Sequence, residues 1–244
     1  MKCVILQPSY IPWRGVFDQI NRADVFIFYD DVQYDKHGWR NRNQIKTDQG
    51  RQWLTIPVHS GGVVEKSIPI NQVQIDWSRP WNEAHWKSFT FAYKKAPFFQ
   101  KYAAWLEPFY QRHDVLLADF TIELTIALAR ELGITHTRFM RSSEIEATGK
   151  KTERLVQILT QVGATHYFSG PSARDYIEDD QFAAAGIRLE YVEYNYPEYP
   201  QLHPPFDPQV SILDLLFNTG PEAMRYITMK EKQETKNKNA IRKT

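Results

Sequence analysis

The stretch KCVILQPSYIPWRGVFDQINRADVFIFYDD, residues 2–31, decides the fold of this chain. Its first apolar run, Lys2–Leu6, ends at a glutamine–proline pair and predicts a buried strand. Gly15–Arg22 carries its apolar residues on one side, which predicts a helix. Asp24–Tyr29 is a second apolar run and predicts another fully buried strand. Continuously apolar strands that alternate with a helix are typical of a parallel sheet covered on both faces.

The rest of the chain continues this pattern. An antiparallel pair is predicted at Trp39–Lys46 and Arg51–Val58, turning at Asp48–Gly50, and an extended piece at Ile68–Ile75. The other predicted helices are Pro80–Tyr93, Pro97–His113, Val115–Leu132, Thr152–Val162 and Ser211–Asn218, and the other strands are His136–Arg141, His166–Ser169 and Ile187–Glu193. These elements predict a three-layer α/β fold with a mostly parallel central sheet and a helical insertion at about 80–132. We expect a single α/β domain over residues 1–228.

Composition and hydropathy favour a cytoplasmic protein. Of the 244 residues, 42% are apolar and 24% are charged, which is ordinary for a globular protein. The single cysteine, Cys3, excludes an intramolecular disulfide and fits a reducing compartment. The first ten residues lack the features of a signal peptide. The longest apolar stretch, Val115–Ala129, contains Asp119 and Glu123, so we expect no membrane span.

The charges are unevenly distributed along the chain. Residues 229–244 contain six basic and two acidic residues and predict a basic, disordered tail. Removing them from the 30 basic and 29 acidic residues of the whole chain leaves 24 and 27, so the remainder carries a formal charge of about −3. A mildly acidic body argues against nucleic acid as the primary ligand, because nucleic-acid-binding proteins present a basic face.

Most familiar catalytic motifs are absent from the sequence. It contains no G-x-S-x-G, no G-x-x-x-x-G-K-[ST], no G-x-G-x-x-G and no H-E-x-x-H. The histidines show no metal-ligand spacing, and one cysteine cannot build a zinc site. We therefore predict no nucleophilic triad and no metal-ligating residues, and the need for Mg²⁺ stays open.

Unusual polar residues follow the first two predicted strands. Gln7, Tyr10 and Arg14 lie where the first strand turns into the helix, and backbone N–H groups at such a turn can face a ligand. Asp30 ends the second strand, where a carboxylate can act as a general base. Ligands of open parallel sheets bind beyond the carboxyl ends of the strands. The alternatives are a proline-stiffened loop and a carboxylate that caps a turn.

The segment after the second strand is polar on both faces. On a strand, Arg40, Arg42 and Lys46 share one face, and Asn41 and Asn43 share the other. Two arginines at this spacing suit bidentate recognition of phosphate or carboxylate. A solvated edge strand is the alternative interpretation.

A second polar segment follows the strand at 166–169. Ser169 and Gly170 are small enough to let a ligand approach the backbone closely. Arg174 and Asp175 then supply both charges, and Asn218 ends the last predicted helix. We expect this segment to form one pocket with the polar residues of the first 46, although a plain strand–loop junction would show the same residues.

A run of tyrosines precedes the last predicted helix. Tyr191, Tyr194, Tyr196 and Tyr199 occur together with Pro197 and Pro200, an arrangement that suits a stacking wall for a sugar or a base. A rigid, packed loop is the other interpretation.

Several of these residues fall into strings that resemble the WbqC-like family. The matching strings are Gln7-Pro8-x-Tyr10-x-Pro12-Trp13-x-Gly15-x-Phe17-Asp18, Ala23-Asp24-x-Phe26, Asp30-Asp31-Val32-Gln33-Tyr34, Trp39-x-Asn41-Arg42-Asn43, Ile45-Lys46, Ser169-Gly170, Asp175-Tyr176, Phe206-x-Pro208 and Ser211-Ile212-x-Asp214-Leu215-Leu216-Phe217-Asn218. The resemblance covers about 1–220. It implies a role in surface-polysaccharide or secondary-metabolite biosynthesis, with transfer of an acyl or aminoacyl group to an amino sugar, but no agreed catalytic residues.

Together, the residues and the resemblance predict an N-acyl- or aminoacyltransferase that acts on an amine of a nucleotide-linked amino sugar or similar phosphate-bearing metabolite. The co-substrate would be an activated acyl or aminoacyl donor. Two other classes stay open. One is a ligand-binding or regulatory module without chemistry. The other is a nucleotidyltransferase or adenylate-forming ligase, although the H-x-G-H histidines of the nucleotidyltransferases are missing at 13–16.

Amide formation on a phosphate-bearing substrate needs cationic groups that bind the phosphate, a base, and hydrogen-bond donors for the developing oxyanion. The candidates for these three roles are Arg40, Arg42 and Arg174 for phosphate, Asp30 or Asp175 for the proton, and Asn41, Asn43 or the Ser169-Gly170 backbone for the oxyanion. Because no Ser–His or Cys–His pair is evident, we expect direct attack on an activated donor rather than a covalent intermediate.

Overall fold

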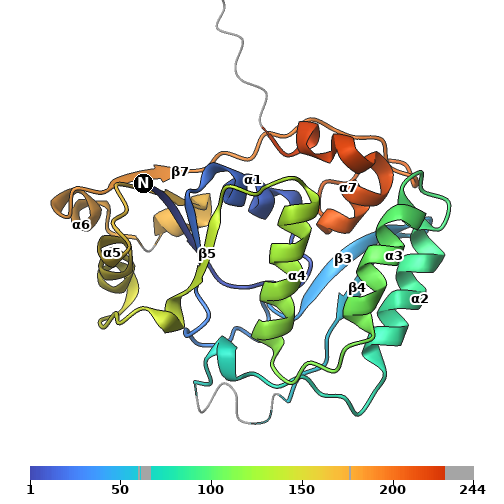
Figure 1. Cartoon of the computed structure of the whole chain (residues 1–244), viewed down its shortest axis with the longest axis horizontal. Helices are drawn as coiled ribbons and strands as arrows, with labels where there is room; N and C mark the ends of the chain where they lie inside the picture. Colours follow the sequence, from blue (N-terminus) through green and yellow to red (C-terminus); the bar gives the residue numbers. More distant parts are fainter. Residues whose placement is uncertain (60, 62–66, 176, 229–244) are drawn as a thin grey trace, which may run out of the picture.

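Five parallel strands form the central sheet of the computed structural model, which describes residues 1–59, 61, 67–175 and 177–228 (Figure 1). Their order across the sheet is β5-β2-β1-β6-β7. The strands are β1 (Lys2–Leu6), β2 (Val25–Phe28), β5 (Arg138–Arg141), β6 (His166–Ser169) and β7 (Arg188–Tyr191). The predicted parallel sheet is confirmed.

Helices cover both faces of this sheet, which is why its strands are apolar throughout. Cys3 and Ile5 of β1 belong to one buried cluster and Val4 belongs to the other, as alternation along a strand requires. The first face packs against α5 (Lys151–Gln161) and α6 (Asp179–Ala184). The second packs against α1 (Arg14–Arg22) and α4 (Leu117–Glu131), and Figure 1 shows the two helix layers on opposite sides of the sheet.

The predicted helical insertion is also confirmed. It consists of α2 (Trp81–Tyr93), α3 (Phe99–Tyr110) and α4. These helices share one buried cluster with the sheet and with α7 (Ile212–Thr219). Burying one large apolar side chain in such a cluster stabilises the fold by about 1.5–3 kcal/mol.

A separate antiparallel pair lies beside these helices. It is formed by β3 (Arg42–Thr47) and β4 (Gly50–Thr55), with Arg42 opposite Thr55 and Thr47 opposite Gly50. Gly50 has a positive φ of 101°, a conformation that glycine adopts without strain. The predicted turn at Asp48–Gly50 therefore fits the observed hairpin.

Two local predictions differ from the structure. Ile68–Ile75 is a 3₁₀ turn at Ile70–Gln72 with isolated bridges on either side, because Pro69 has no N–H with which to continue a ladder. The short helix α6 was not predicted. The remaining 3₁₀ segments are Ser142–Glu144, Pro171–Asp175 and Gly220–Tyr226.

No helix within the described residues is long and apolar enough to cross a membrane. The tail predicted at 229–244 lies outside the described residues, and the single-domain boundary at 228 stays a prediction.

Candidate functional site

The order of the strands creates a crevice between β1 and β6. From β1 the chain continues to β2 on one side, and from β6 it continues to β7 on the other, so the loops after these neighbouring strands diverge. Such a switch point is where open α/β sheets bind ligands. A cleft of about 890 Å³ opens there, lined by Leu6 at the end of β1, by Ser9 in the loop after it and by Ser172 after β6. Its volume is in the range of small-molecule sites.

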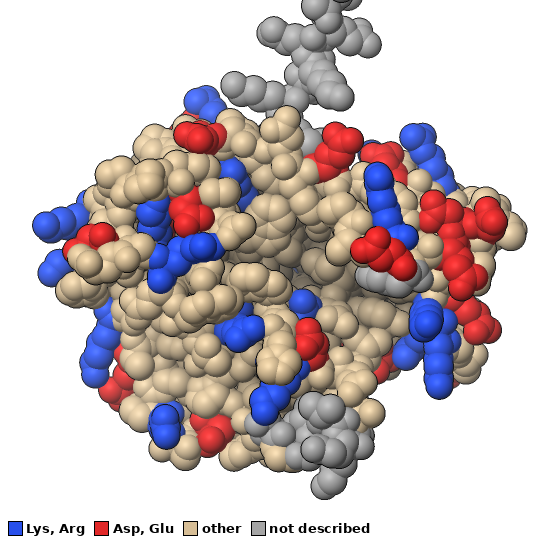
Figure 2. All heavy atoms as spheres, turned by 180° about the vertical axis from the view of Figure 1, so that it is seen from behind, with Lys and Arg blue, Asp and Glu red and all other residues tan. Residues whose placement is uncertain are grey.

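Aromatic side chains form much of the cleft wall. The described residues that line it are Leu6, Ser9, Pro12, Trp13, Arg14, Val16, Gln19, Trp39, Arg40, Asn43, Ser172, Tyr194, Asn195, Tyr196, Glu198, Phe206, Pro208 and Gln209. The Trp13 ring meets Tyr194 and Tyr196 edge to face, with centroids 4.9 and 6.0 Å apart. Figure 2 shows one face of the molecule hollowed near its centre, with basic and acidic side chains both present around the hollow.

The loop between β1 and α1 is held in an uncommon conformation. Ile11 has a φ of 35°, which a β-branched residue adopts only when its surroundings impose it. The Asn43 side chain supplies that constraint, since its Nδ2 donates to the carbonyls of Ile11 (2.8 Å) and Tyr10 (3.1 Å). A Cβ at Gly15 would clash with the Trp13 indole, so glycine lets this ring lie against the start of α1.

Arg14, the first residue of α1, lines the cleft, and three aromatic rings surround its guanidinium. Its guanidinium carbon lies 5.1 Å from the Tyr196 ring centre, 5.3 Å from Tyr199 and 5.7 Å from Phe206. Nη1 donates to the Pro197 carbonyl at 2.8 Å. Burial lowers the pKa of the guanidinium. No carboxylate of the described residues forms an ion pair with it.

Arg40 lines the same cleft, and the acceptors of its side-chain hydrogen bonds in the described structure are backbone carbonyls. Its Nη1 donates to the carbonyls of Gln7 (3.0 Å) and Pro8 (3.3 Å). Its Nε is buried without a hydrogen-bond partner. Burial lowers the pKa of this guanidinium to about 10. Throughout the described ranges, Arg40 has no acidic ion-pair partner either. The charge of Asp35 offsets part of the lowering of its pKa, and Glu198 lines the cleft, but neither carboxylate forms an ion pair with Arg14 or Arg40.

The segment 193–209, which forms the opposite wall, is anchored by side chains of the helices. Tyr196 donates to Asp18 at 2.8 Å, and Gln19 donates to Tyr194 at 2.9 Å. Tyr199 donates to the buried carboxylate of Asp214 in α7 at 2.8 Å. These bonds use the outer ends of the tyrosines and leave ring surfaces of Tyr194 and Tyr196 on the cleft.

The buried carboxyl group of Asp214 makes the stability of the fold depend on pH. Burial raises the pKa of its carboxyl above the ordinary 3.8, and hydrogen bonds from Tyr199, Tyr93 and Gln201 offset only part of that rise. The folded state therefore holds the proton at pH values where the unfolded chain has released it. The resulting stabilisation is complete below about pH 4 and declines, by up to about 1.4 kcal/mol per pH unit, until the folded pKa is passed.

We expect Asp214→Asn to remove this decline. The measurement is the free energy of unfolding in urea from about pH 4 to about pH 7, where the wild type should lose more stability than the variant. The exposed Asp180, replaced by asparagine, is the control and should behave like the wild type. Parallel pH curves for Asp214→Asn and the wild type would contradict the role given to burial.

Of the predicted site residues, Arg14, Arg40 and Asn43 line the cleft. Gln7 takes part through its backbone carbonyl, which accepts the bond from Arg40. Ser169 is buried at the end of β6, and its carbonyl accepts the Val192 N–H. The next residue, Gly170, leads to the 3₁₀ segment that places Ser172 on the cleft.

The two charged residues of that segment lie outside the cleft lining. The Arg174 guanidinium lies over the Tyr191 ring, 4.7 Å from its centre. Asp175 is exposed at the end of the segment. Its predicted role as a base therefore finds no support in the lining.

Asp30 is fully buried and serves the fold. Oδ1 accepts from the Ser142 hydroxyl (3.2 Å) and the Ser143 N–H (3.1 Å), and Oδ2 accepts from the Ser143 hydroxyl (2.9 Å). It joins the carboxyl end of β2 to the turn after β5. The expectation that Asp30 shares the pocket is not met, because its carboxylate is enclosed by these donors.

Three other predicted residues are engaged in the interior. The Tyr10 hydroxyl bonds to His85 (2.8 Å) and Tyr110 (2.7 Å). Asn41 donates to the Ile56 carbonyl at 2.8 Å, and Asn218 donates to the Asp214 carbonyl and accepts the Leu202 N–H. The Tyr10 hydroxyl and the Asn218 amide therefore satisfy groups of the fold and are not directed at a ligand. The buried Oδ1 of Asn41 has no hydrogen-bond partner in the described structure.

Arg42 and Lys46 lie on β3, outside the lining. The Arg42 guanidinium donates to the carbonyls of Gly38 and His37 and lies over the Trp53 ring. Lys46 Nζ donates to Gln201 at 3.1 Å.

Three residues of the cleft lining, Trp39, Ser172 and Glu198, were not among the site residues predicted from the sequence. Only Trp39 could have been found, because it directly precedes the predicted Arg40.

Metal ligands do not gather within the described residues: no three His, Cys, Asp or Glu side chains could hold an ion together.

The fold and the cleft define an α/β protein with a switch-point site of small-molecule size. The chain belongs to the WbqC-like protein family, whose model matches residues 7–226, so the resemblance seen in the sequence is confirmed. It is 45% identical over 228 residues to the uncharacterized protein Rv1507c of Mycobacterium tuberculosis, an alignment that covers 93% of this chain and 97% of that protein. No solved structure matches the chain significantly.

Proposed function

We propose that the chain transfers an acyl or aminoacyl group to an amine of a phosphate-bearing ring metabolite, in the class of nucleotide-linked amino sugars. One observation supports this most: Arg14 and Arg40, without acidic partners in the described structure, line an aromatic cleft at the switch point of the sheet. Surface-polysaccharide or secondary-metabolite biosynthesis is the setting we propose. A cytoplasmic location fits the free Cys3.

An anionic ligand accounts for the two arginines. Desolvating a cation costs several kcal/mol when no opposite charge compensates for it. Here the compensation comes from carbonyl oxygens and aromatic rings, and at Arg40 also from the charge of Asp35, which forms no ion pair with it. A phosphate oxygen would complete the hydrogen bonding of the guanidinium groups, and arginine suits it because its planar donors match the phosphate geometry.

Glu198 is the carboxylate best placed to act as a base. It is the one acidic side chain in the cleft lining, and no hydrogen bond or ion pair engages it in the described structure. The amine nitrogen attacks the carbonyl carbon of the activated donor, and a C–N bond forms. The bond to the leaving group breaks with its electron pair, and the amine proton passes to Glu198.

The donors for the developing oxyanion would be Ser172 and Ser9, which both line the cleft. The Ser9 hydroxyl would have to give up its long bond of 3.4 Å to the Gln7 carbonyl. Asn43 is unsuitable, since its Nδ2 already donates to two carbonyls. A covalent intermediate on Cys3 is also unfavourable, because burial raises the pKa of its thiol to about 12. These points support direct attack on an activated donor.

The test combines the protein with nucleotide-linked amino sugars and activated acyl or aminoacyl donors, and follows product mass. Arg40→Ala should weaken substrate affinity about 10- to 100-fold, the loss of a hydrogen bond to a charged group. Arg40 is preferred to Arg14 because removing Arg14 would also disturb three aromatic contacts. The control is Arg188→Ala, because the Arg188 side chain lies on β7 and is 74% exposed.

Failure to form an amide with any pair would reject the transferase. Binding without turnover would favour the ligand-binding module instead. ATP–pyrophosphate exchange in the presence of an acid would identify an adenylate-forming ligase. Equal losses of affinity in the Arg40 and Arg188 variants would reject the cleft as the site.

A further inference from the structure

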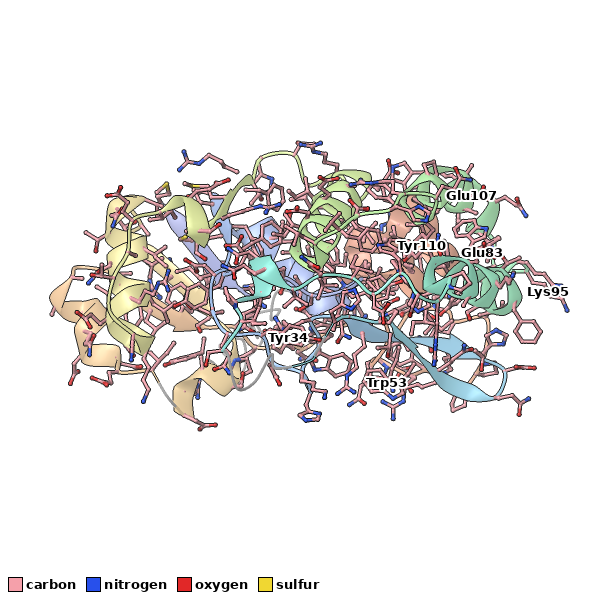
Figure 3. The ribbon with its side chains drawn as sticks, turned by 90° about the horizontal axis from the view of Figure 1, so that it is seen from below. Tyr34, Trp53, Glu83, Lys95, Glu107 and Tyr110 are labelled. Carbon is pink, nitrogen blue, oxygen red and sulfur yellow. The ribbon has the colours of Figure 1, made fainter. Side chains whose placement is uncertain are left out.

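Two tryptophans beside the cleft are unusually exposed. Trp39 and Trp53 each keep 46% of their accessible surface. Their ring centres are 5.2 Å apart, and the planes are inclined by 30°. Figure 3 shows Trp53 on the side of the β3–β4 hairpin away from the helices that carry Glu83 and Glu107. Exposed aromatic surface gathered in one place is typical of a binding site, whereas isolated exposed residues are not.

A cation borders this aromatic pair. The Arg42 guanidinium carbon lies 4.8 Å from the centre of the Trp53 ring. Bonds from Arg42 to the carbonyls of Gly38 and His37 hold it there, and no carboxylate of the described chain forms an ion pair with it. The arrangement offers a ring surface and a positive charge to one ligand.

The aromatic pair is continuous with the cleft. Trp39 belongs to the cleft lining, and so does Arg40, the next residue in the chain. The Trp39 carbonyl accepts the Tyr10 N–H at 3.2 Å, which ties this segment to the loop after β1. A ligand ring on the tryptophans would therefore lie next to an anion held by Arg40.

We propose that Trp39 and Trp53 form a subsite for the nucleobase of a nucleoside diphosphate group whose phosphates reach Arg40. The inference rests on the proposed function, since it assigns the nucleotide part of that substrate. Stacking explains the exposed rings, because any base offers a planar face to an indole. A mononucleotide is favoured over a nucleic-acid strand, since the cleft is of small-molecule size and the body of the chain is mildly acidic.

The experiment compares the binding of UDP, CDP, GDP and ADP with that of inorganic pyrophosphate, which has the phosphates but no base, by calorimetric titration of the whole chain. At least one nucleotide should bind the wild type about 5- to 100-fold more tightly than pyrophosphate. Trp53→Ala should abolish this preference and leave pyrophosphate binding unchanged. Trp53→Phe should retain most of it, because a ring is kept.

The matched control is Phe91→Ala, which removes a side chain that is 71% exposed on α2. It should leave the preference unchanged. Three results would overturn the subsite: equal binding of nucleotides and pyrophosphate by the wild type, an undiminished preference in Trp53→Ala, or tighter binding of an oligothymidine strand than of any mononucleotide.

These outcomes separate the subsite from the proposed reaction. Nucleotide preference without amide formation in any assay would keep the subsite and reject the transferase. Amide formation without a base preference would reject the subsite alone.

Discussion

Glutamine in place of Glu198 is expected to lower kcat about 10²- to 10⁴-fold, the usual contribution of a general base. Glutamine has nearly the same shape but cannot accept the amine proton. Affinity for the phosphate-bearing substrate should stay close to that of the wild type, because Arg14 and Arg40 are untouched. No other carboxylate of the described chain lines the cleft, so none is in place to substitute for it.

The pH profile distinguishes a chemical role for Glu198 from a structural one. A carboxylate base makes the rate fall on the acidic side, and that limb should disappear in Glu198→Gln. Glu193→Gln is the control, since Glu193 is exposed in the same segment but lies outside the lining. An unchanged kcat in Glu198→Gln would show that Glu198 is not the base. The proposed role of Arg14 and Arg40 in binding an anion would be unaffected.

The fold was predictable because its determinants are local. The apolar runs of β1 and β2 and the one-sided pattern of α1 are each contained in a few consecutive residues. The parallel sheet then follows from the burial of both strand faces. The extended piece expected at Ile68–Ile75 is interrupted by a 3₁₀ turn, because Pro69 cannot donate to a ladder.

The site was predictable only in part. Arg14 and Arg40 stood out because cations at strand ends are unusual unless they meet an anion. Asn43 and Asn218 look similar in sequence, yet their amides satisfy backbone groups of the fold, and Asn43 does so 32 residues away at Ile11. Hydrogen-bond partners that lie so far apart along the chain leave no local pattern in the sequence. Glu198 lies in a proline-rich segment without periodicity, so nothing in the sequence indicated which way it points.

Asp30 illustrates the same ambiguity, and replacing it with alanine should reveal a structural role. The Ser143 hydroxyl and N–H would lose their acceptor, and the Ser142 hydroxyl would keep only Asp31. The Arg141 guanidinium would lose a carboxylate 3.9 Å away. Hydrogen bonds to a charged group contribute about 1.5–3 kcal/mol each, and not all are independent, so we expect a loss of about 3 kcal/mol or more. For a chain of this length, that lowers Tm by roughly 6–12 °C.

Thermal and urea unfolding would measure the loss, with Asp48→Ala as the control because Asp48 is exposed in the β3–β4 turn. Asp30→Asn retains an acceptor and most of the shape, so it should fold well enough for kinetics. Its kcat per folded molecule should stay close to that of the wild type, because Asp30 is fully buried and absent from the cleft lining. A stable Asp30→Asn variant with kcat reduced about 100-fold or more would instead make Asp30 the base and displace Glu198 from that role.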